Sequence, residues 1–419
     1  MIKLQDVSFI VTDVETTGSN AIKNRITEIA CVTMRDGEII NEFSTLLNPY
    51  QTIPPFVSRM TGITQSMVLS APDEFEIIDA VKSLFDVNNP VFAAHNVNFD
   101  FAFVKSFFKR GFMNFDYPQL CTLKLARKVL PGNLKKNVGD LSAYFGIRMN
   151  NRHRALIDAR STAIILSELL YIIRTEHKVN TLQELLQFQN KSVMNYKVPK
   201  DICQRFQPDL DNVPFSPGIF KFYDKHDNCI YWDYSFNLNT KLHLFFETGY
   251  IASKYLYELS AKIDKIVWEE YDSELSMLLQ RNKIINKAQS QTISLFNDSS
   301  TNDSCNHDSS FIFMQPQQNH ERAVNFYFFC RGTFFNHVIL GTKAYTDKVS
   351  EILLQMNQTG QDISFDSEDY KVIQKWLQMQ NDTGMIIDIT DKSMDIILEE
   401  IDELVVEWFY SHADEYELR

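Results

Sequence analysis

The chain has 419 residues, which is too long for one ordinary domain and predicts two or three. Hydrophobic residues make up 44% and aromatic residues 13% of the sequence, which excludes a mainly disordered chain. No apolar run approaches the length of a membrane span, no secretory signal is evident, and the six cysteines form no C-x-x-C pair. We therefore expect a cytoplasmic protein without a membrane segment, disulfide framework or zinc ribbon.

The net charge of −13 is unevenly distributed along the chain. Residues 361–419 hold sixteen acidic and four basic residues, whereas residues 101–160 hold twelve basic and three acidic residues. The basic segment, from Lys124 to Arg154 in particular, can contact phosphates while the acidic tail lies elsewhere. Solvated helix faces would explain the same charges equally well.

Residues 1–175 have the pattern of an α/β unit. Apolar runs predict strands, and helical periodicity follows them. The expected strands are 7–12, 26–34, 39–47 and 91–94, and the expected helices are 99–109, 120–129, 138–145 and 159–173. Residues 176–212 are polar with helical patches and are expected to form a connector.

A second, smaller α/β unit is expected at residues 213–296, with strands at 218–223 and 229–234 and helical stretches from 250 to about 288. Residues 297–322 are rich in Ser, Asn, Asp and Gln, a composition that predicts a disordered linker. Residues 323–419 are expected to form an acidic α+β domain that opens with a strand at 324–330 and closes with a helix at 394–409.

Two carboxylates, Asp13 and Glu15, directly follow the first predicted strand. Residues at i and i+2 on a strand point to the same side, so both side chains can bind common metal ions. Asp100 stands at the start of a predicted helix that follows the 91–94 strand, and His153 precedes Asp158 by five residues where another apolar-periodic helix opens.

These motifs, in this order and spacing, resemble those of the DEDDh exonucleases, the family of the proofreading (DnaQ, epsilon-type) subunit of bacterial DNA polymerase III. The resemblance covers about residues 5–175 and includes lesser matches at 26–29, 60–64 and 125–128. It implies a ribonuclease H-like fold, a mixed sheet flanked by helices. It also implies that two Mg²⁺ or Mn²⁺ ions are bound by four acids: Asp13, Glu15, Asp100 and Asp158.

The resemblance further implies a role for each catalytic residue. Asp13 would bridge the two ions, Glu15 and Asp158 would complete the site that binds the attacking water, and Asp100 would hold the second ion through water. His153 would deprotonate the attacking water. Two hard cations about 3.5–4 Å apart suit phosphodiester cleavage, and a histidine pKa near 6.5 suits a base at neutral pH.

Six further residues near these motifs are candidate substrate contacts. In the resembled family, the backbone that follows the first two acids approaches the 3′-terminal nucleotide, although a glycine there can also serve only a turn. The candidates are Thr16, Thr17, Gly18, His95, Asn98 and Phe99. Aromatic residues that open a helix, such as Phe99, are more often core residues than stacking platforms.

Residues 213–290 carry G-I-F at 218–220 and Y-W-D at 231–233, and this segment resembles the GIY-YIG endonuclease domain of the UvrC excision-repair protein. The sequence departs from that domain at the positions expected to carry out catalysis. Phe220 replaces a tyrosine, Asp233 a glycine, Lys241 an arginine and Gln280 a metal-binding glutamate. Lysine cannot make arginine's bidentate phosphate contact, and glutamine is a poor ligand for a hard cation. We therefore expect an inactive nuclease that is kept as a structural module or as a module that binds DNA or protein.

Residues 291–296, Q-T-I-S-L-F, resemble the short peptides that bacterial replication proteins insert into the sliding clamp. The anchors would be Gln291, Ile293, Leu295 and Phe296, although these residues could instead complete the core of the preceding unit.

The leading hypothesis is a metal-dependent 3′→5′ exonuclease that removes nucleotides from DNA ends in replication proofreading or repair. Its expected partners are DNA, a replicative polymerase and the sliding clamp, and it would associate with the nucleoid when bound to DNA. Two alternatives stay open: RNA 3′-end trimming, and a non-catalytic scaffold that binds nucleic acid or a polymerase.

Overall fold

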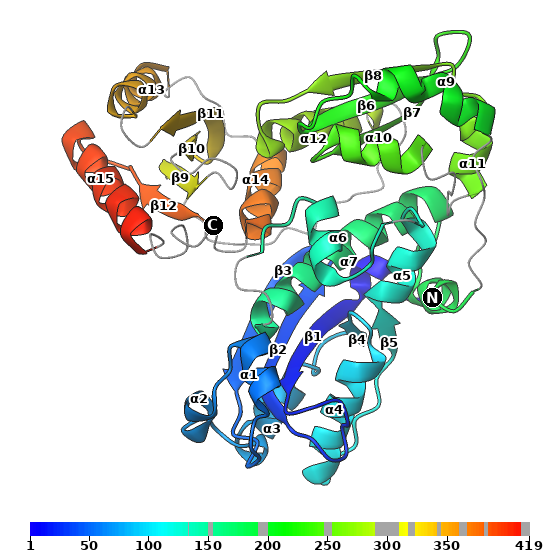
Figure 1. Ribbon diagram of the computed structural model, residues 1–419, viewed down its shortest axis with the longest axis vertical. Coiled ribbons are helices and arrows are strands. Elements are labelled where there is room, and N and C mark those ends of the chain that lie inside the picture. Colours follow the sequence, from blue (N-terminus) through cyan, green and yellow to red (C-terminus); the bar gives the residue numbers. More distant parts are fainter. Residues whose placement is uncertain are drawn as a thin grey trace. The chain divides into compact units, whose positions relative to one another are not determined.

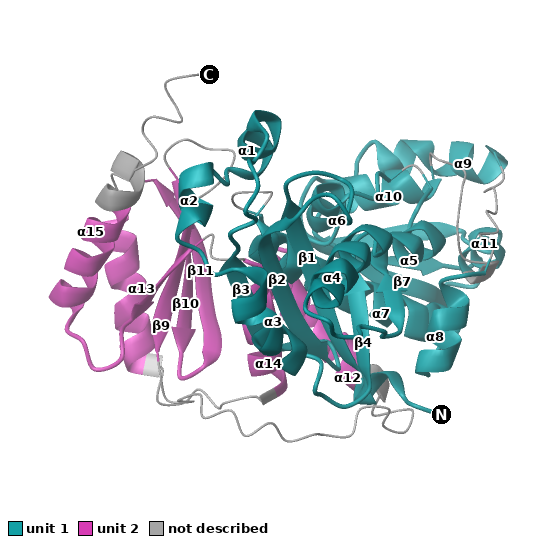
Figure 2. Cartoon of the chain, turned by 90° about the horizontal axis from the view of Figure 1, so that it is seen from below, with its two compact units in different colours: residues 1–270 teal, residues 271–419 magenta. Residues whose placement is uncertain are grey.

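The computed structural model describes residues 1–132, 134–149, 154–191, 200–246, 254–289, 310–316, 323–341, 345–359, 367–380 and 384–411. These residues form two compact units, Met1–Glu270 and Tyr271–Arg419, which Figure 2 colours separately. No helix in the described ranges is both long enough and apolar enough to cross a membrane.

A mixed five-stranded sheet lies at the centre of the first unit (Figure 1). Its strands, in spatial order, are β3 (Glu38–Leu46), β2 (Ile26–Arg35), β1 (Ser8–Thr16), β4 (Pro90–Ala94) and β5 (Gln119–Cys121). β1, β2 and β3 pair antiparallel, whereas β4 pairs parallel with both β1 and β5. The apolar runs that predicted the central strands fit a sheet buried on both faces, so the predicted mixed sheet is confirmed.

Helices cover the two faces of this sheet. Ile10 and Val14 of β1 share a core with residues of α3 (Glu74–Ser83) and α4 (Asn98–Arg110). The long helix α7 (Ala155–His177) packs on β1 and β2. Because side chains alternate along a strand, the residues of β1 that flank Val14 face away from the α3–α4 core. Asp13 and Glu15 are therefore on the α7 side of the sheet.

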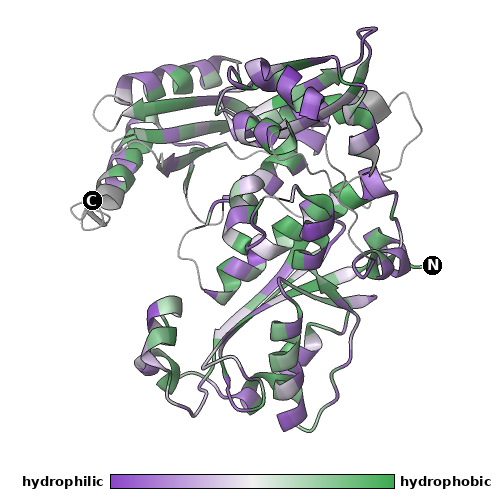
Figure 3. Cartoon of the chain, turned by 45° about the vertical axis from the view of Figure 1, so that its right-hand side comes forward, coloured by the Kyte–Doolittle hydropathy of each residue, from purple (hydrophilic) through white to green (hydrophobic). Residues whose placement is uncertain are grey.

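Five shorter helices complete this part of the unit: α1 (Pro55–Thr61), α2 (Gln65–Leu69), α5 (Thr122–Val129), α6 (Val138–Tyr144) and α8 (Leu182–Phe188). The segment 120–129 was predicted to be wholly helical, but its first residues pair with β4 as the edge strand β5 and the helix begins at Thr122. In Figure 3 the helices carry both hydrophilic and hydrophobic residues, as expected of helices with one buried face.

A second, antiparallel sheet in the first unit has the order β7-β6-β8. Its elements and their helices are β6 (Gly218–Tyr223), β7 (Cys229–Ser235), β8 (Lys265–Glu270), α9 (Lys200–Leu210), α10 (Leu238–Phe246) and α11 (Lys254–Ser260). The prediction of helical stretches from 250 to about 288 is wrong at β8, which is a strand. Ile266 is buried against the core of this sheet, and pairing with β6 satisfies the backbone of β8.

The second unit is built on a four-stranded antiparallel sheet. Its strands in spatial order are β11 (Thr333–Gly341), β10 (Ala323–Cys330), β9 (Phe311–Pro316) and β12 (Met385–Asp388). Its helices are α12 (Glu274–Gln289), α13 (Thr346–Thr359), α14 (Ser367–Met379) and α15 (Met394–Ser411).

Strand β9 corrects the sequence prediction, because it lies within the 297–322 tract that was expected to be a disordered linker. Ile312 and Met314 are buried in the core of the second unit, and β9 pairs with both β10 and β12. A short apolar segment within a polar tract thus gains enough buried surface to become ordered. The other residues of the tract, apart from Ser310, lie outside the described ranges.

Candidate active site

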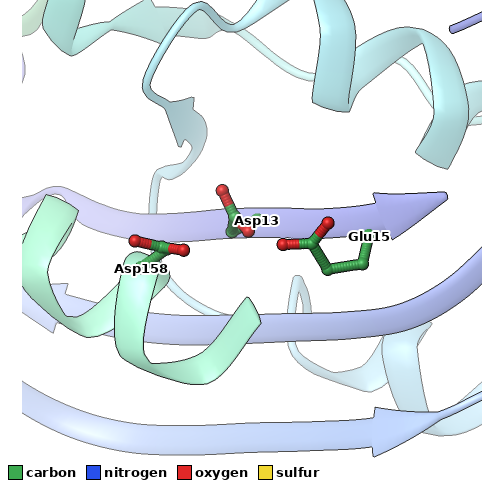
Figure 4. A group of neighbouring side chains, drawn as sticks. All are labelled: Asp13, Glu15 and Asp158. Atoms are coloured by element: carbon green, nitrogen blue, oxygen red, sulfur yellow. The ribbon is translucent and has the colours of Figure 1, made fainter. Parts of the chain in front are cut away.

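Three of the predicted metal ligands lie together on the α7 side of the central sheet. Asp13 and Glu15 project from β1, and Asp158 projects from the first turn of α7 (Figure 4). One carboxylate oxygen from each lies within 4.8 Å of the other two, and these three residues are here called the carboxylate group. The packing of α7 across β1 and β2 therefore unites residues that are far apart in the sequence.

The fourth predicted ligand, Asp100, reaches β1 from helix α4. It is buried, and its Oδ1 accepts a hydrogen bond of 3.2 Å from the backbone N–H of Val14. Asp100 is not a member of the carboxylate group, but its charge raises the pKa of Asp13. Asp13 therefore lies under the influence of acids from both α7 and α4.

The electrostatics of these acids favour a bound cation. Burial raises the pKa of Asp13 well above its ordinary value, and the charges of Asp100 and Asp158 raise it further. Burial and Asp158 raise the pKa of Glu15 to about 8, although Arg154 opposes this shift. Burial raises the pKa of Asp100 to about 8, against the stabilising hydrogen bond from Val14. Divalent cations would offset this repulsion, so the donor set fits hard metal ions.

The loop after β1 is held together by its own side chains. Thr16 Oγ1 donates to the carbonyl of Gly18 at 2.8 Å, and Thr17 Oγ1 donates to Gln51 Oε1 at 3.0 Å. Gln51 Nε2 in turn donates to the carbonyl of Lys23 at 2.9 Å. The two threonine hydroxyls thus stabilise the loop, and the Thr17 N–H is held as well, by the carbonyl of Arg25 at 2.9 Å. Nothing in the sequence pattern had indicated a role for Gln51.

The close packing of this loop also explains a glycine at position 18. A Cβ atom there would lie 2.8 Å from the side chain of Asn24, closer than ordinary packing allows. Gly18 therefore suits the packing of the loop itself, because a Cβ atom there would require the Asn24 side chain to move.

The other predicted substrate contacts are spread around the start of α4. His95 Nδ1 lies 2.9 Å from Thr122 Oγ1, and burial lowers the pKa of its imidazole. Asn98 is exposed as the first residue of α4. Phe99 is partly buried against the core, with its ring centroid 5.0 Å from that of Phe103. Of these residues, Asn98 has the most accessible side chain.

Some lysines of the basic segment support loops. Lys128 is 7% exposed and donates to the backbone carbonyl of Lys191. Lys136 donates to the carbonyls of Pro131 and Leu134. The basic segment therefore offers fewer free cations than its composition suggested.

Two predicted features, His153 and the 291–296 peptide, lie outside the described residues, so their roles stay predictions.

The positions that resemble a GIY-YIG site form a second polar group, here called the Lys241 cluster: Tyr231, Asp233, Tyr234 and Lys241. Lys241 Nζ lies 2.6 Å from Asp233 Oδ2 and donates to the carbonyl of Tyr234 at 2.7 Å. The hydroxyl of Tyr231 also donates to Asp233, at 3.1 Å. The charge of Asp233 is thus already compensated. Gln280, the remaining motif position, lies in α12.

The Lys241 cluster packs against the helices that follow the central sheet. The Tyr234 hydroxyl donates a buried 2.7 Å hydrogen bond to Glu168 of α7. Lys241 Nζ lies 5.9 Å from the ring centroid of Tyr144 at the end of α6. A Cβ atom at Gly146 would lie 2.4 Å from the ring of Phe236. Residues 229–246 therefore share a tightly packed surface with α6 and α7.

A mixed sheet of this order, with clustered acids on its first strand and on a packed helix, defines a ribonuclease H-like nuclease fold. Residues 10–166 match the family model described as Exonuclease (RNase_T). Over 169 residues the chain is 38% identical to DNA polymerase III subunit epsilon of Aquifex aeolicus, a match that covers 40% of this chain and 82% of that protein. The chain belongs to this exonuclease family.

Another relative extends further along the chain. Over 254 residues the chain is 33% identical to a Mycobacterium tuberculosis protein with the provisional name of bifunctional exonuclease/endonuclease. The match covers 58% of this chain but only 38% of that protein's length. Among solved structures, exonuclease X in complex with 5′ overhanging duplex DNA is 27% identical, with 43% of this chain and 99% of that chain covered and a TM-score of 0.34.

Proposed function

We propose that the chain is a metal-dependent 3′→5′ exonuclease of the DEDDh type that acts on DNA ends. The observation that carries this proposal is the group formed by Asp13, Glu15 and Asp158, which bring one carboxylate oxygen each to within 4.8 Å of the others. The epsilon subunit named above belongs to a DNA polymerase, which favours DNA over RNA as the substrate. A replicative polymerase and the sliding clamp, the latter through residues 291–296, are the corresponding candidate partners.

The residues that would hold two Mg²⁺ or Mn²⁺ ions are Asp13, Glu15, Asp100 and Asp158. When bound, such ions stabilise the negative charge on the attacking and leaving oxygens of a phosphodiester. Asp13 is the natural shared ligand because the charges of both Asp100 and Asp158 act on it. His153 would accept a proton from the attacking water. The loop at Thr16, Thr17 and Gly18, in which Gln51 holds Thr17, would approach the terminal nucleotide.

For the Lys241 cluster we propose a structural role without hydrolysis. Asp233 is paired with Lys241 and accepts from Tyr231, so its charge is not available to a metal ion. The hydrogen bond between Tyr234 and Glu168 connects the GIY-YIG-like strands to helix α7. The module would then brace the exonuclease fold, although it derives from an endonuclease-like sequence.

The test is digestion of four 5′-end-labelled substrates with Mg²⁺: single-stranded DNA, matched duplex, duplex with a mispaired 3′ end, and single-stranded RNA. We expect progressive shortening of single-stranded and mispaired DNA, none in EDTA, and none with the Asp13→Asn variant. Persistent shortening by that variant would overturn the site assignment. Preferential RNA digestion would favour the trimming alternative, and DNA binding without shortening would favour the scaffold.

A further inference from the structure

Glu28 is a buried acid next to the carboxylate group, and the proposed reaction gives it no role. Its exposed fraction is 2%, and it is paired in register with Glu15 across β1 and β2. Paired residues of antiparallel strands point to the same face, so Glu28 lies on the side of the sheet that carries Asp13 and Glu15. A buried acid in a mostly apolar strand requires specific partners.

Those partners come from the start of α7. Arg154 Nε lies 3.2 Å from each carboxylate oxygen of Glu28, and Arg154 Nη2 lies 2.9 Å from Oε1. The backbone N–H of Ala155 donates to Glu28 Oε2 at 3.0 Å. Both oxygens of Glu28 are therefore occupied by donors from the residues that begin the helix.

This arrangement replaces a missing helix cap. Arg154 occupies the N-cap position of α7, and its side chain makes no capping hydrogen bond. The first N–H groups of a helix have no partner within the helix, and an acidic oxygen is the preferred acceptor for them. Glu28 supplies that acceptor from the neighbouring strand β2, so it fixes the first turn of α7 to the central sheet.

Asp158 lies one turn further along the same helix, and its backbone N–H donates to the carbonyl of Arg154 at 3.1 Å. We propose that Glu28 is a positioning residue: by holding Arg154 and Ala155 it sets the position of Asp158 relative to Asp13 and Glu15. This inference rests on the proposed function. Arg154 neutralises Glu28, so that Glu28 serves as an anchor and the other acids serve as metal ligands.

The chain offers a matched control on the same helix. Arg160 Nη2 lies 2.7 Å from Glu42 Oε2 of β3, which makes a second arginine–glutamate pair between α7 and the sheet. Glu28→Gln removes the charge but keeps an acceptor for Ala155, and Arg154→Met keeps the aliphatic stem of a side chain that is 40% exposed. Glu42→Gln is the corresponding change on β3, which β2 separates from the strand of Asp13 and Glu15.

The experiment measures Mn²⁺ binding by calorimetry and turnover on 5′-labelled single-stranded DNA, with folding verified by circular dichroism. We expect Glu28→Gln and Arg154→Met each to weaken Mn²⁺ binding and to lower kcat about 10–100-fold, with KM for DNA unchanged. The double variant should be no worse than the poorer single variant, because both changes break one interaction. Arg154→Lys should recover only part of the loss, since lysine lacks the bidentate fork.

Three results would overturn the inference: wild-type Mn²⁺ binding and turnover in both single variants, multiplied effects in the double variant, or an equal loss in Glu42→Gln. If Glu28→Gln weakens Mn²⁺ binding while Arg154→Met does not, Glu28 is a direct ligand and the positioning role is wrong. Should Glu28→Gln fail to fold, the surface variant Arg154→Met decides alone. Failure of the proposed function would appear differently, as a wild-type chain that binds Mn²⁺ without shortening DNA.

Discussion

Two groups of polar residues in the first unit differ in how their acidic charges are balanced. At the carboxylate group, burial raises the pKa of Asp13, and the charges of Asp100, Asp158 and Glu15 raise it further. In the Lys241 cluster, burial acts to lower the pKa of Lys241, but Asp233, through its charge and its hydrogen bond, outweighs burial together with Tyr144 and Glu176, and the pKa is raised. Repelling acids favour an external cation, whereas an acid with its own lysine is already neutralised. The difference separates a site suited to metal chemistry from a structural brace.

The largest expected effect follows from removing one ligand of the carboxylate group. Asp13→Asn or Asp158→Asn should abolish Mg²⁺- or Mn²⁺-dependent hydrolysis, because one carboxylate fewer disrupts a shared two-metal site. The measurement is the digestion rate of labelled single-stranded DNA. Asp233→Asn is the control in the other cluster and should digest at close to the wild-type rate. A comparable loss in Asp233→Asn would remove the distinction between the two groups.

The next effect concerns proton transfer. His153→Ala should retain metal and DNA binding but slow turnover by roughly 10²–10⁴-fold, the usual consequence of losing a general base. Binding is measured separately, by fluorescence anisotropy of labelled DNA with Ca²⁺ in place of Mg²⁺. Turnover at the parental rate would show that His153 is not the base.

A smaller effect is expected when the Lys241 cluster loses its cation. Lys241→Met leaves Asp233 without its cation, although Tyr231 still donates to it. The change should lower the free energy of unfolding by about 2 kcal/mol, less than for a fully buried pair because both side chains are partly exposed. Urea unfolding measures this change. Lys265→Met, which breaks the exposed pair with Asp227 in the same part of the unit, should have almost no effect. Equal stabilities of the two variants would argue against a structural brace.

The smallest effect is a pH dependence of stability without metal. Folded Glu15 and Asp100 have pKa values of about 8, above their ordinary values of 4.5 and 3.8. At pH values between the ordinary and the raised pKa, the folded chain holds protons that the unfolded chain has released, so stability falls as the pH rises. In EDTA, Glu15→Gln should therefore lose less in Tm between about pH 5 and pH 8 than the wild type, by roughly 2–4 °C. Glu42→Gln should keep the wild-type slope, and identical slopes for Glu15→Gln and the wild type would contradict the shifted pKa values.

The sequence was most informative where structure is local. Long apolar runs and helical periodicity predicted β1, β2 and α4 to within a few residues. A buried strand or helix face requires apolar residues in runs or at regular intervals, and these can be recognised in the sequence. It failed at β8 and β9, short strands whose stability comes from partners elsewhere in the chain. Their few apolar residues are indistinguishable from a helix or a linker until the pairing is known.

The same limit applies to the candidate site. Motif spacing was sufficient to nominate Asp13, Glu15 and Asp158, and the structure places them together, although their roles stay predictions. The sequence gives no indication that Arg154 contacts Glu28 or that Gln51 holds Thr17, since each pair joins distant segments. For the first pair, the one available signal in the sequence was Glu28, a charged residue inside a mostly apolar strand. Such a residue predicts a partner but does not identify it.

The most direct test of the division between the two groups is a comparison of linear and covalently closed circular single-stranded DNA of the same sequence. Both would be incubated with the full-length chain and Mg²⁺. If hydrolysis occurs at the carboxylate group alone, the linear strand is shortened from its 3′ end and the circle remains intact. Linearisation of the circle that persists in the Asp13→Asn variant would contradict this account, because it would place hydrolysis outside the carboxylate group.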